Sequence, residues 1–206
     1  LKEVVPPEAY AQLVSHYQAA LQGHGHKFEM EAVREHFLVD IAPVRDDNDT
    51  ILAGMIMATN ITERKEMERQ IIHQALHDSL TGLPNRALLL DRLDQAIVQA
   101  QRHGSTVATL FVDIDDFKVV NDTMGHAAGD RLLQQLADRF STCLQQVDVV
   151  TRFGGDEFVV LLSDVDGARG ALDVANRLVD SLHLPLSVND QALHLSCSIG
   201  IALSVA

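Results

Sequence analysis

The sequence contains no tryptophan, only two cysteines and few aromatic residues of any kind. The two cysteines, Cys143 and Cys197, stand far apart, and neither has a second metal-binding residue at short spacing. A disulfide framework or a zinc site is therefore not expected. We interpret both cysteines as small, buried apolar residues, because free cysteine is among the most often buried residue types.

Basic side chains are also scarce, since 16 lysines and arginines face 29 aspartates and glutamates and give a formal net charge of −13. Binding to nucleic acid or to an anionic membrane needs a concentrated basic face. We therefore expect neither a nucleic-acid partner nor direct membrane contact. A small phosphorylated ligand held through a metal ion is compatible with this charge.

Long apolar runs are absent, and none approaches the roughly 20 residues that span a bilayer. Residues 1–7 also lack the layout of a secretion signal. These two absences predict a cytoplasmic fragment, although its parent protein could be anchored in a membrane. With 206 residues and 47% hydrophobic content, the chain can bury one core of ordinary size or two smaller ones.

Residues 1–61 have the pattern of one helix followed by three strands. Apolar residues at helical spacing predict a helix over 8–22, and extended patterns predict strands over 27–33, 36–44 and 51–58. The polar cluster Asp46 to Asp49 predicts a hairpin turn between the last two strands. This order indicates a small antiparallel meander.

Residues 62–76 favour a helix, with Thr62 as its N-cap. Met67, Ile71 and Ala75 fall on one stripe, and Ile72 and Leu76 lie beside it. Such a short apolar seam predicts contact between two copies of the chain, although the same stripe could pack on its own domain.

Residues 77–206 alternate between helical and strand patterns. The pattern predicts helices from about 84 to 100, over 127–144 and over 168–182, and strands over 106–112, 149–153, 158–162 and 193–203 with a helper stretch at 186–188. Strand, helix, hairpin, helix and strand in this order match the ferredoxin-like βαββαβ plan. The predicted fold class is therefore α+β.

Carboxylates gather at two places that this plan brings together. Asp113 ends the strand over 106–112, and Asp156 and Glu157 follow the glycine pair Gly154 and Gly155. The hairpin strand is expected beside the first strand, so Asp113 and Asp156 could face one another and share Mg²⁺. Glycine would let a phosphate approach the backbone. One of Asp115 and Asp116 could instead only cap the next helical turn.

Four segments in this order closely resemble the GGDEF domain family of diguanylate cyclases, whose fold is nucleotidyl-cyclase-like. They are H-D-S-L-T-G-L-P-N-R (77–86), F-V-D-I-D-D-F-K (111–118), N-D-T-M-G-H (121–126) and R-F-G-G-D-E-F (152–158). Residues 1–61 resemble the C-terminal part of a PAS sensor domain, whose exit resembles N-I-T-E-R-K (60–65). An unrelated β-meander is the alternative there. The resemblance divides the chain into 1–61, a linker helix over 62–76 and 77–206.

The resemblance implies an enzyme that condenses two GTP molecules into cyclic di-GMP and pyrophosphate with Mg²⁺ or Mn²⁺, regulated by the PAS part. Each domain would bind one GTP, so a homodimer formed through the linker helix and the GGDEF domains is implied. Asn121 and Asp130 match the guanine-binding positions, and a carboxylate suits the N1–H and amino group of guanine. The other implied site residues are the metal ligands Asp113, Asp156, Glu157 and the Ile114 carbonyl, with Glu157 also a candidate base; Lys118 near the phosphates; Gly154 and Gly155 beside them; and the apolar pocket Leu80, Phe117 and Leu133.

Two departures from the family pattern affect this expectation. The product-inhibition site R-x-x-D is replaced by Gln145-Gln146-Val147-Asp148, so feedback inhibition should be weak. The sequence stops at Ala206, before further basic residues and a closing helix of the family, so the fragment is expected to bind GTP poorly or turn over slowly. The alternative function is a GTP-binding regulatory module that controls a downstream EAL phosphodiesterase in the parent protein.

Overall fold

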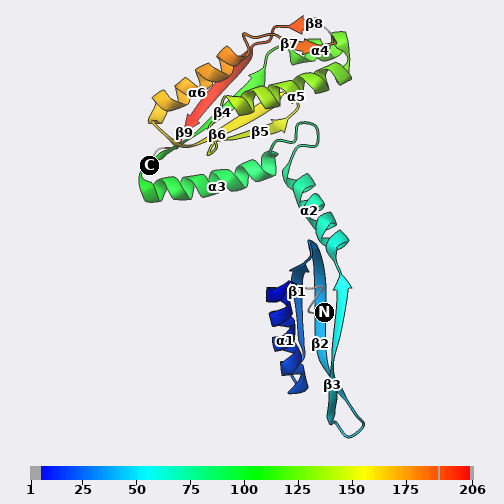
Figure 1. The fold of residues 1–206 in the computed structure, drawn as a ribbon. Coiled ribbons are helices and arrows are strands. Elements are labelled where there is room, and N and C mark those ends of the chain that lie inside the picture. The colour runs from blue at the N-terminus through cyan, green and yellow to red at the C-terminus, as the bar shows by residue number, and fades with distance from the viewer. Residues whose placement is uncertain (1–5, 190, 205–206) are drawn as a thin grey trace. The chain divides into compact units, whose positions relative to one another are not determined.

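The structure of the chain is a computed structural model that describes residues 6–189 and 191–204. The chain divides into two compact units, residues 1–72 and 73–206, and the division falls inside helix α2 (Thr62–Leu76). Each unit has its own sheet (Figure 1) and buries its own apolar residues. Within the described residues, no helix combines the length and the apolar character that crossing a bilayer requires.

The first unit is one helix against a three-stranded antiparallel sheet, as the sequence pattern predicts. Its elements are α1 (Pro7–Leu21), β1 (His26–Ala32), β2 (Glu35–Arg45) and β3 (Ile51–Asn60), with strand order β1-β2-β3. Alternation in β2 buries Val39 and Ile41 against Leu13 and Ala20 of α1. The predicted hairpin turn is confirmed, because Asp46 Oδ1 accepts hydrogen bonds from two backbone N–H groups within it.

Helix α2 spans the predicted residues, but the prediction of Thr62 as its N-cap is wrong. The carbonyl of Ile61 accepts from the N–H of Lys65 at 3.0 Å, so Ile61 occupies the cap position and Thr62 is the first helical residue. The side chain of Asn60 accepts from the Thr62 N–H at 2.9 Å. The Thr62 hydroxyl instead accepts from the His36 N–H at 2.9 Å, because β2 runs close enough to use it.

The apolar stripe of α2 is exposed within the described residues. Met67 is 51% exposed, Ile71 64% and Ile72 59%, and no residue of this helix is buried. On its polar side, Arg64 and Glu68 form the i,i+4 ion pair that their spacing predicts, with Nε and Oε1 3.6 Å apart. The helix therefore presents an uncovered apolar surface of side chains at helical spacing.

The second unit contains a four-stranded antiparallel sheet with the ferredoxin-like order β5-β6-β4-β9. This order and the βαββαβ succession confirm the predicted fold class. The elements are α3 (Arg86–His103), β4 (Thr106–Ile114), α4 (Phe117–Met124), α5 (His126–Thr142), β5 (Val149–Gly154), β6 (Glu157–Val165), α6 (Gly167–Ser181), β7 (Leu186–Val188), β8 (Gln191–Leu193) and β9 (Cys197–Leu203).

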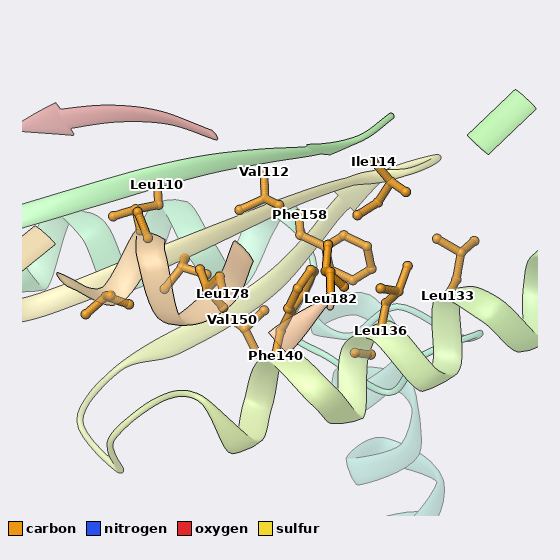
Figure 2. Packing of buried hydrophobic residues seen from close by; sticks show 14 of the residues in the cluster. Leu110, Val112, Ile114, Leu133, Leu136, Phe140, Val150, Phe158, Leu178 and Leu182 are labelled. Atoms are coloured by element: carbon orange, nitrogen blue, oxygen red, sulfur yellow. The ribbon is translucent and has the colours of Figure 1, made fainter. Parts of the chain in front are cut away.

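The two faces of this sheet pack against different helices. Leu110 and Val112 of β4 and Phe158 of β6 belong to the larger core, which α5 and α6 complete (Figure 2). Val107 and Val159 point to the opposite face and belong to a smaller core with α3. Because successive side chains of a strand alternate between faces, the apolar residues of β4 and β6 fix both layers at once.

Three differences from the sequence prediction lie in segments around the candidate site. Residues 117–124 form the separate helix α4, where only a helical turn was expected, and Gly125 with φ of +83° separates it from α5. The strand predicted over 193–203 is two strands, because β8 pairs with β7 whereas β9 pairs with β4. Finally, β4 continues through Asp113 to Ile114, since both residues still pair with β9.

Residues 77–85 are fastened to the hairpin of β5 and β6 by one arginine. Arg152 Nη1 lies 3.0 and 3.2 Å from the two carboxylate oxygens of Asp78, which also accepts from the N–H and hydroxyl of Thr81. The same guanidinium donates from Nε and Nη2 to the carbonyl of Gly155, at 3.0 and 2.8 Å. Burial raises the pKa of Asp78, but the hydrogen bonds from Thr81 and Arg152 outweigh it and lower the pKa overall.

This ion pair predicts a pH-dependent contribution to the stability of the second unit. A carboxylate with a lowered folded-state pKa stabilises the fold above its ordinary pKa of 3.8, and this contribution is lost as the pH falls through the lowered value. The free energy of unfolding of Asp78→Asn should be about 2 kcal/mol below wild type at pH 7. The difference should shrink towards pH 2 in urea titrations. The exposed Asp138→Asn is the control, and a pH-independent deficit in Asp78→Asn would contradict the assignment.

Candidate active site

The central feature of the candidate site is a pair of carboxylates on neighbouring strands. In the register of β4 and β6, Asp113 lies directly opposite Glu157, and both side chains are exposed. Residues directly opposite in an antiparallel pair have Cβ atoms about 5 Å apart on the same face. Asp156, which is half-buried, stands one residue earlier in the turn. The register thus places Glu157, rather than Asp156, across from Asp113.

The turn beside these acids leaves open space next to its backbone. Gly154 and Gly155 are both exposed, and a Cβ built on either would meet no atom within 4 Å. Gly155 has φ of +55°, in the left-handed region that favours glycine. Its carbonyl is held by Arg152. The turn is therefore fixed in position, and a bulky anion could approach it.

The segment after β4 turns sharply into α4. Ile114 is buried, Asp116 takes a left-handed φ of +57°, and Phe117 is buried at the start of the helix. Hydrogen bonds from Ser196 and Ser198 lower the pKa of the Asp115 carboxyl. Lys118 is exposed on the first turn of α4.

Nearby Cys197 is half-buried, and its thiol stays protonated. Burial, followed by the charge of Asp115, raises its pKa to about 11. Cys197 and Cys143 are both free thiols that pack against the larger core but are only partly buried, so the prediction that they are buried is met only in part.

Gly129 of α5 lets Asn121 of α4 approach α5 closely. A Cβ on Gly129 would lie 2.0 Å from Asn121 Oδ1 and 3.2 Å from Phe117 Cζ, so only glycine permits this approach. Asn121 Oδ1 is buried and has no hydrogen-bond partner among the described residues. An unpartnered buried acceptor is costly unless a ligand donates to it. Asp130 follows on α5 and is exposed.

The three residues predicted to form an apolar pocket all belong to the larger core of the second unit or pack against it. Phe117 and Leu133 are buried in the larger core, and Leu80 packs against it. The carbonyl of Leu80 accepts from Gln134 Nε2 at 3.0 Å, which holds residues 77–85 to α5. The structure therefore brings Leu80, Phe117 and Leu133 together.

The residues available to hold a metal ion are few. Among residues 6–189 and 191–204, no three histidine, cysteine or acidic side chains gather closely enough to enclose an ion by themselves. Mg²⁺ in proteins is commonly held by one or two carboxylates, with water and substrate phosphates completing the set. The paired carboxylates of Asp113 and Glu157, with open space beside the glycine turn, fit that kind of site.

The segment that the resemblance predicts to be a degenerate inhibitory site, Gln145 to Asp148, forms a turn closed by its own side chain. Asp148 Oδ2 accepts from the Gln145 N–H at 3.0 Å, so this carboxylate closes its own turn. A cavity of about 240 Å³ adjoins both residues and is also lined by Asp173 and Arg177. Gln145 is exposed and offers an amide where the family pattern has a guanidinium.

Two contributors to the site were not assigned a role from the sequence. Asp78 and Arg152 stand inside the quoted motifs, but their ion pair joins residues 74 positions apart. In the sequence, these two residues could be noticed only by their places in the motifs: Asp78 directly follows His77, and Arg152 stands two residues before Gly154. Their contact follows from the fold, because β5 lies beside the backbone of residues 77–85, where Arg152 N–H donates to the Pro84 carbonyl.

Comparisons with known proteins show the family of the second unit. The family model described as "Diguanylate cyclase, GGDEF domain" matches residues 75–206. The diguanylate cyclase TpbB of Pseudomonas aeruginosa is 45% identical over 134 residues, which cover 65% of this chain and 31% of TpbB. The chain thus spans less than a third of the length of this curated relative.

Solved structures support the same assignment. The GGDEF domain of TpbB from Pseudomonas aeruginosa matches with a TM-score of 0.60 and 44% identity, covering 62% of this chain and 74% of that one. The coiled coil and GGDEF domain of DgcB from Caulobacter crescentus, in complex with c-di-GMP, matches with a TM-score of 0.64 and 26% identity, covering 70% and 78%. With its sheet order, its glycine turn and its paired acids, the chain belongs to the diguanylate cyclase GGDEF domain family through residues 75–206.

Proposed function

We propose that the chain is a diguanylate cyclase, which condenses two GTP molecules into cyclic di-GMP and releases pyrophosphate. The observation that carries this proposal is the placement of Asp113 opposite Glu157, beside a glycine turn with open space around it. Two like charges directly across a strand pair destabilise a sheet unless a cation joins them. A metal–nucleotide complex supplies that cation together with the phosphates that the turn can accept.

The candidate ligands of Mg²⁺ or Mn²⁺ at this rim are Asp113, Asp156, Glu157 and the carbonyl of Ile114, of which one or two carboxylates would hold the ion at a time. The metal, when bound, would neutralise phosphate charge. Glu157 lies at the first position of β6 and is exposed, so it could also accept a proton from the attacking 3′-hydroxyl. Lys118 is exposed on α4, and the family resemblance implies a position near the phosphates, where it would offset developing negative charge.

Guanine recognition is assigned to the junction of α4 and α5. Asn121 stands at this junction, and its side-chain oxygen, which has no partner among the described residues, would have to turn away from Gly129 to accept from the N–H groups of guanine. Asp130, on the exposed side of α5, would accept from the same edge of the base. The cluster of Leu80, Phe117 and Leu133 would provide the apolar wall.

The proposed reaction needs two domains, because each site is assigned one GTP. We propose that residues 62–76 join two copies into a homodimer, on the evidence of the exposed apolar stripe of α2. Residues 1–61 are proposed to be the C-terminal part of a PAS sensor, and residues 77–206 the catalytic domain. Holding the two nucleotides in line is a positioning task that can lower the barrier by roughly 7–11 kcal/mol.

The first test is direct synthesis. The chain is incubated with GTP and Mg²⁺, and cyclic di-GMP is measured by chromatography with mass detection. Asp113→Ala and Asp156→Ala should each lose at least about a hundredfold in product, because the metal–phosphate complex loses a ligand. Asp94→Asn on α3, which removes an exposed charge elsewhere, should match wild type. Nucleotide binding without any product in the wild type would count against a cyclase.

Feedback by the product should be weak. The amide of Gln145 lacks the guanidinium fork that grips a phosphate, and Asp148 is engaged in its own turn. Gln145→Arg should tighten cyclic di-GMP binding roughly tenfold or more in calorimetric titrations. Gln146→Arg, at the adjacent exposed position, is the matched control. Submicromolar product affinity of the wild type that disappears on changing Asp148 would refute this expectation.

The α2 stripe should control both dimerisation and turnover. Replacing Met67 and Ile71 by serine removes exposed apolar side chains and should lower dimer formation in analytical ultracentrifugation, with a matching loss of turnover at low protein concentration. Replacing Gln70 and Gln74 by serine on the same helix is the control for helix propensity. Unchanged turnover and unchanged concentration dependence in the first variant would exclude the seam as the dimer contact.

A further inference from the structure

Asp115 is joined to the start of β9 by three hydrogen bonds. Its Oδ2 accepts from Ser196 Oγ at 2.6 Å and its Oδ1 accepts from Ser198 Oγ at 2.8 Å. Its backbone N–H donates to the Ser196 carbonyl at 3.0 Å. Both carboxylate oxygens of this residue are therefore engaged by a segment about eighty positions further along the chain.

These bonds lie where the pairing of two strands ends. The last pairs of β4 with β9 are Asp113 with Ser198 and Ile114 with Cys197. Asp115 extends the connection by one residue beyond that ladder. Because β9 pairs only with β4 among the residues that the structure describes, it is an edge strand there, and no second described strand holds its start. Asp115 supplies the missing attachment.

The turn that follows needs such an attachment. Asp116 adopts a left-handed φ of +57°, which is unfavourable for a residue with a side chain, although aspartate tolerates it better than most. No side chain caps α4 at this residue. Asp115 fixes the chain before the turn, and buried Phe117 fixes it after the turn. The strained conformation is therefore held from both sides.

We propose that Asp115 is a positioning residue that orients the turn carrying Asp113, the Ile114 carbonyl and α4 towards the nucleotide. It is not a ligand of the metal, although it stands among three aspartates in the same motif. This inference rests on the proposed cyclase function. A carboxylate that accepts from two serine hydroxyls could turn towards a metal only by bending or breaking both bonds.

Four variants of the full chain separate this role from a charge or metal-binding role. Asp115→Ala removes both acceptors, and Ser196→Ala with Ser198→Ala removes both donors while the carboxylate stays. Asp115→Asn loses the charge but keeps both contacts, because its oxygen accepts from one serine and its amide donates to the other, whose hydroxyl can accept. Asp94→Asn is the control for a lost negative charge at an exposed position.

Three measurements are made on each variant. Amide hydrogen exchange reports the protection of residues 113–124 and 196–200 without nucleotide or metal. Calorimetry reports binding of an α,β-methylene GTP analogue with Mg²⁺. Initial rates report kcat and KM for GTP. Thermal unfolding checks that each variant is folded. Ser196 and Ser198 are exposed, so replacing both by alanine should leave the fold intact.

A positioning role gives one pattern across the set. Asp115→Ala and the serine variant should lose protection in both segments and lose roughly a hundredfold in kcat/KM, as a misplacement of about 1 Å can cause. Asp115→Asn should stay within about threefold of wild type, because hydroxyl–amide contacts replace hydroxyl–carboxylate contacts. Binding of the GTP analogue should be weakened in Asp115→Ala and in the serine variant, and should stay close to wild type in Asp115→Asn.

Other patterns overturn the inference. If Asp115→Asn is as impaired as Asp115→Ala while the serine variant behaves as wild type, the charge or metal ligation by Asp115 is what matters. Unchanged exchange in both the alanine and the serine variants would also exclude positioning. A wild-type chain that makes no cyclic di-GMP overturns the proposed function instead, and the exchange comparison still decides the role of Asp115.

Discussion

The pairing register of β4 is the constraint on which the candidate site depends. Leu110 and Val112 are buried in the core that α5 and α6 complete, so Asp113 must face the other side of the sheet at its rim. A slip of one residue would exchange the two faces, burying a carboxylate without a partner and exposing valine. The first change costs several kcal/mol and the second about 2 kcal/mol. The hydrophobic core therefore determines where the acids stand.

The rim itself consists of groups that folding alone does not favour. Asp113 and Glu157 place like charges in opposition, Asp116 is left-handed, and Asn121 has a buried oxygen that lacks a partner within the described part of the chain. Each of these costs stability, and the cost is offset by the cores on both faces of the sheet. Two residues hold the rim by hydrogen bonds. Arg152 binds the Gly155 carbonyl on the β6 side of β4, and Asp115 accepts from Ser198 on the β9 side. Strain and exposed charge are thereby concentrated where a nucleotide could relieve them.

The sequence predicts the sheet better than it predicts the contacts of the rim. The strands of the second unit could be predicted because their apolar patterns and the turn at the glycine pair are local features of the sequence. The succession of strands and helices then indicated the ferredoxin-like order. The pairing of Asp113 with Glu157 depends on a register that only the packed core selects. The contacts of Asp78 with Arg152 and of Asp115 with Ser198 join distant residues, and no local pattern reports them. Helix α4 was underestimated because eight residues give too short a periodicity.

Charge bears on how two copies of this chain could cooperate. Each carries a formal net charge of −13, and each proposed substrate adds further negative phosphates. Repulsion between two such chains is screened beyond roughly 8–10 Å at physiological salt, but it acts in full where two active sites must meet. Metal ions at the rim would neutralise the phosphates, not the rest of the surface. A separate attraction is then required, and apolar burial along α2 is insensitive to charge. In the proposed mechanism the acidic catalytic unit therefore depends on a seam outside it to bring its two halves together.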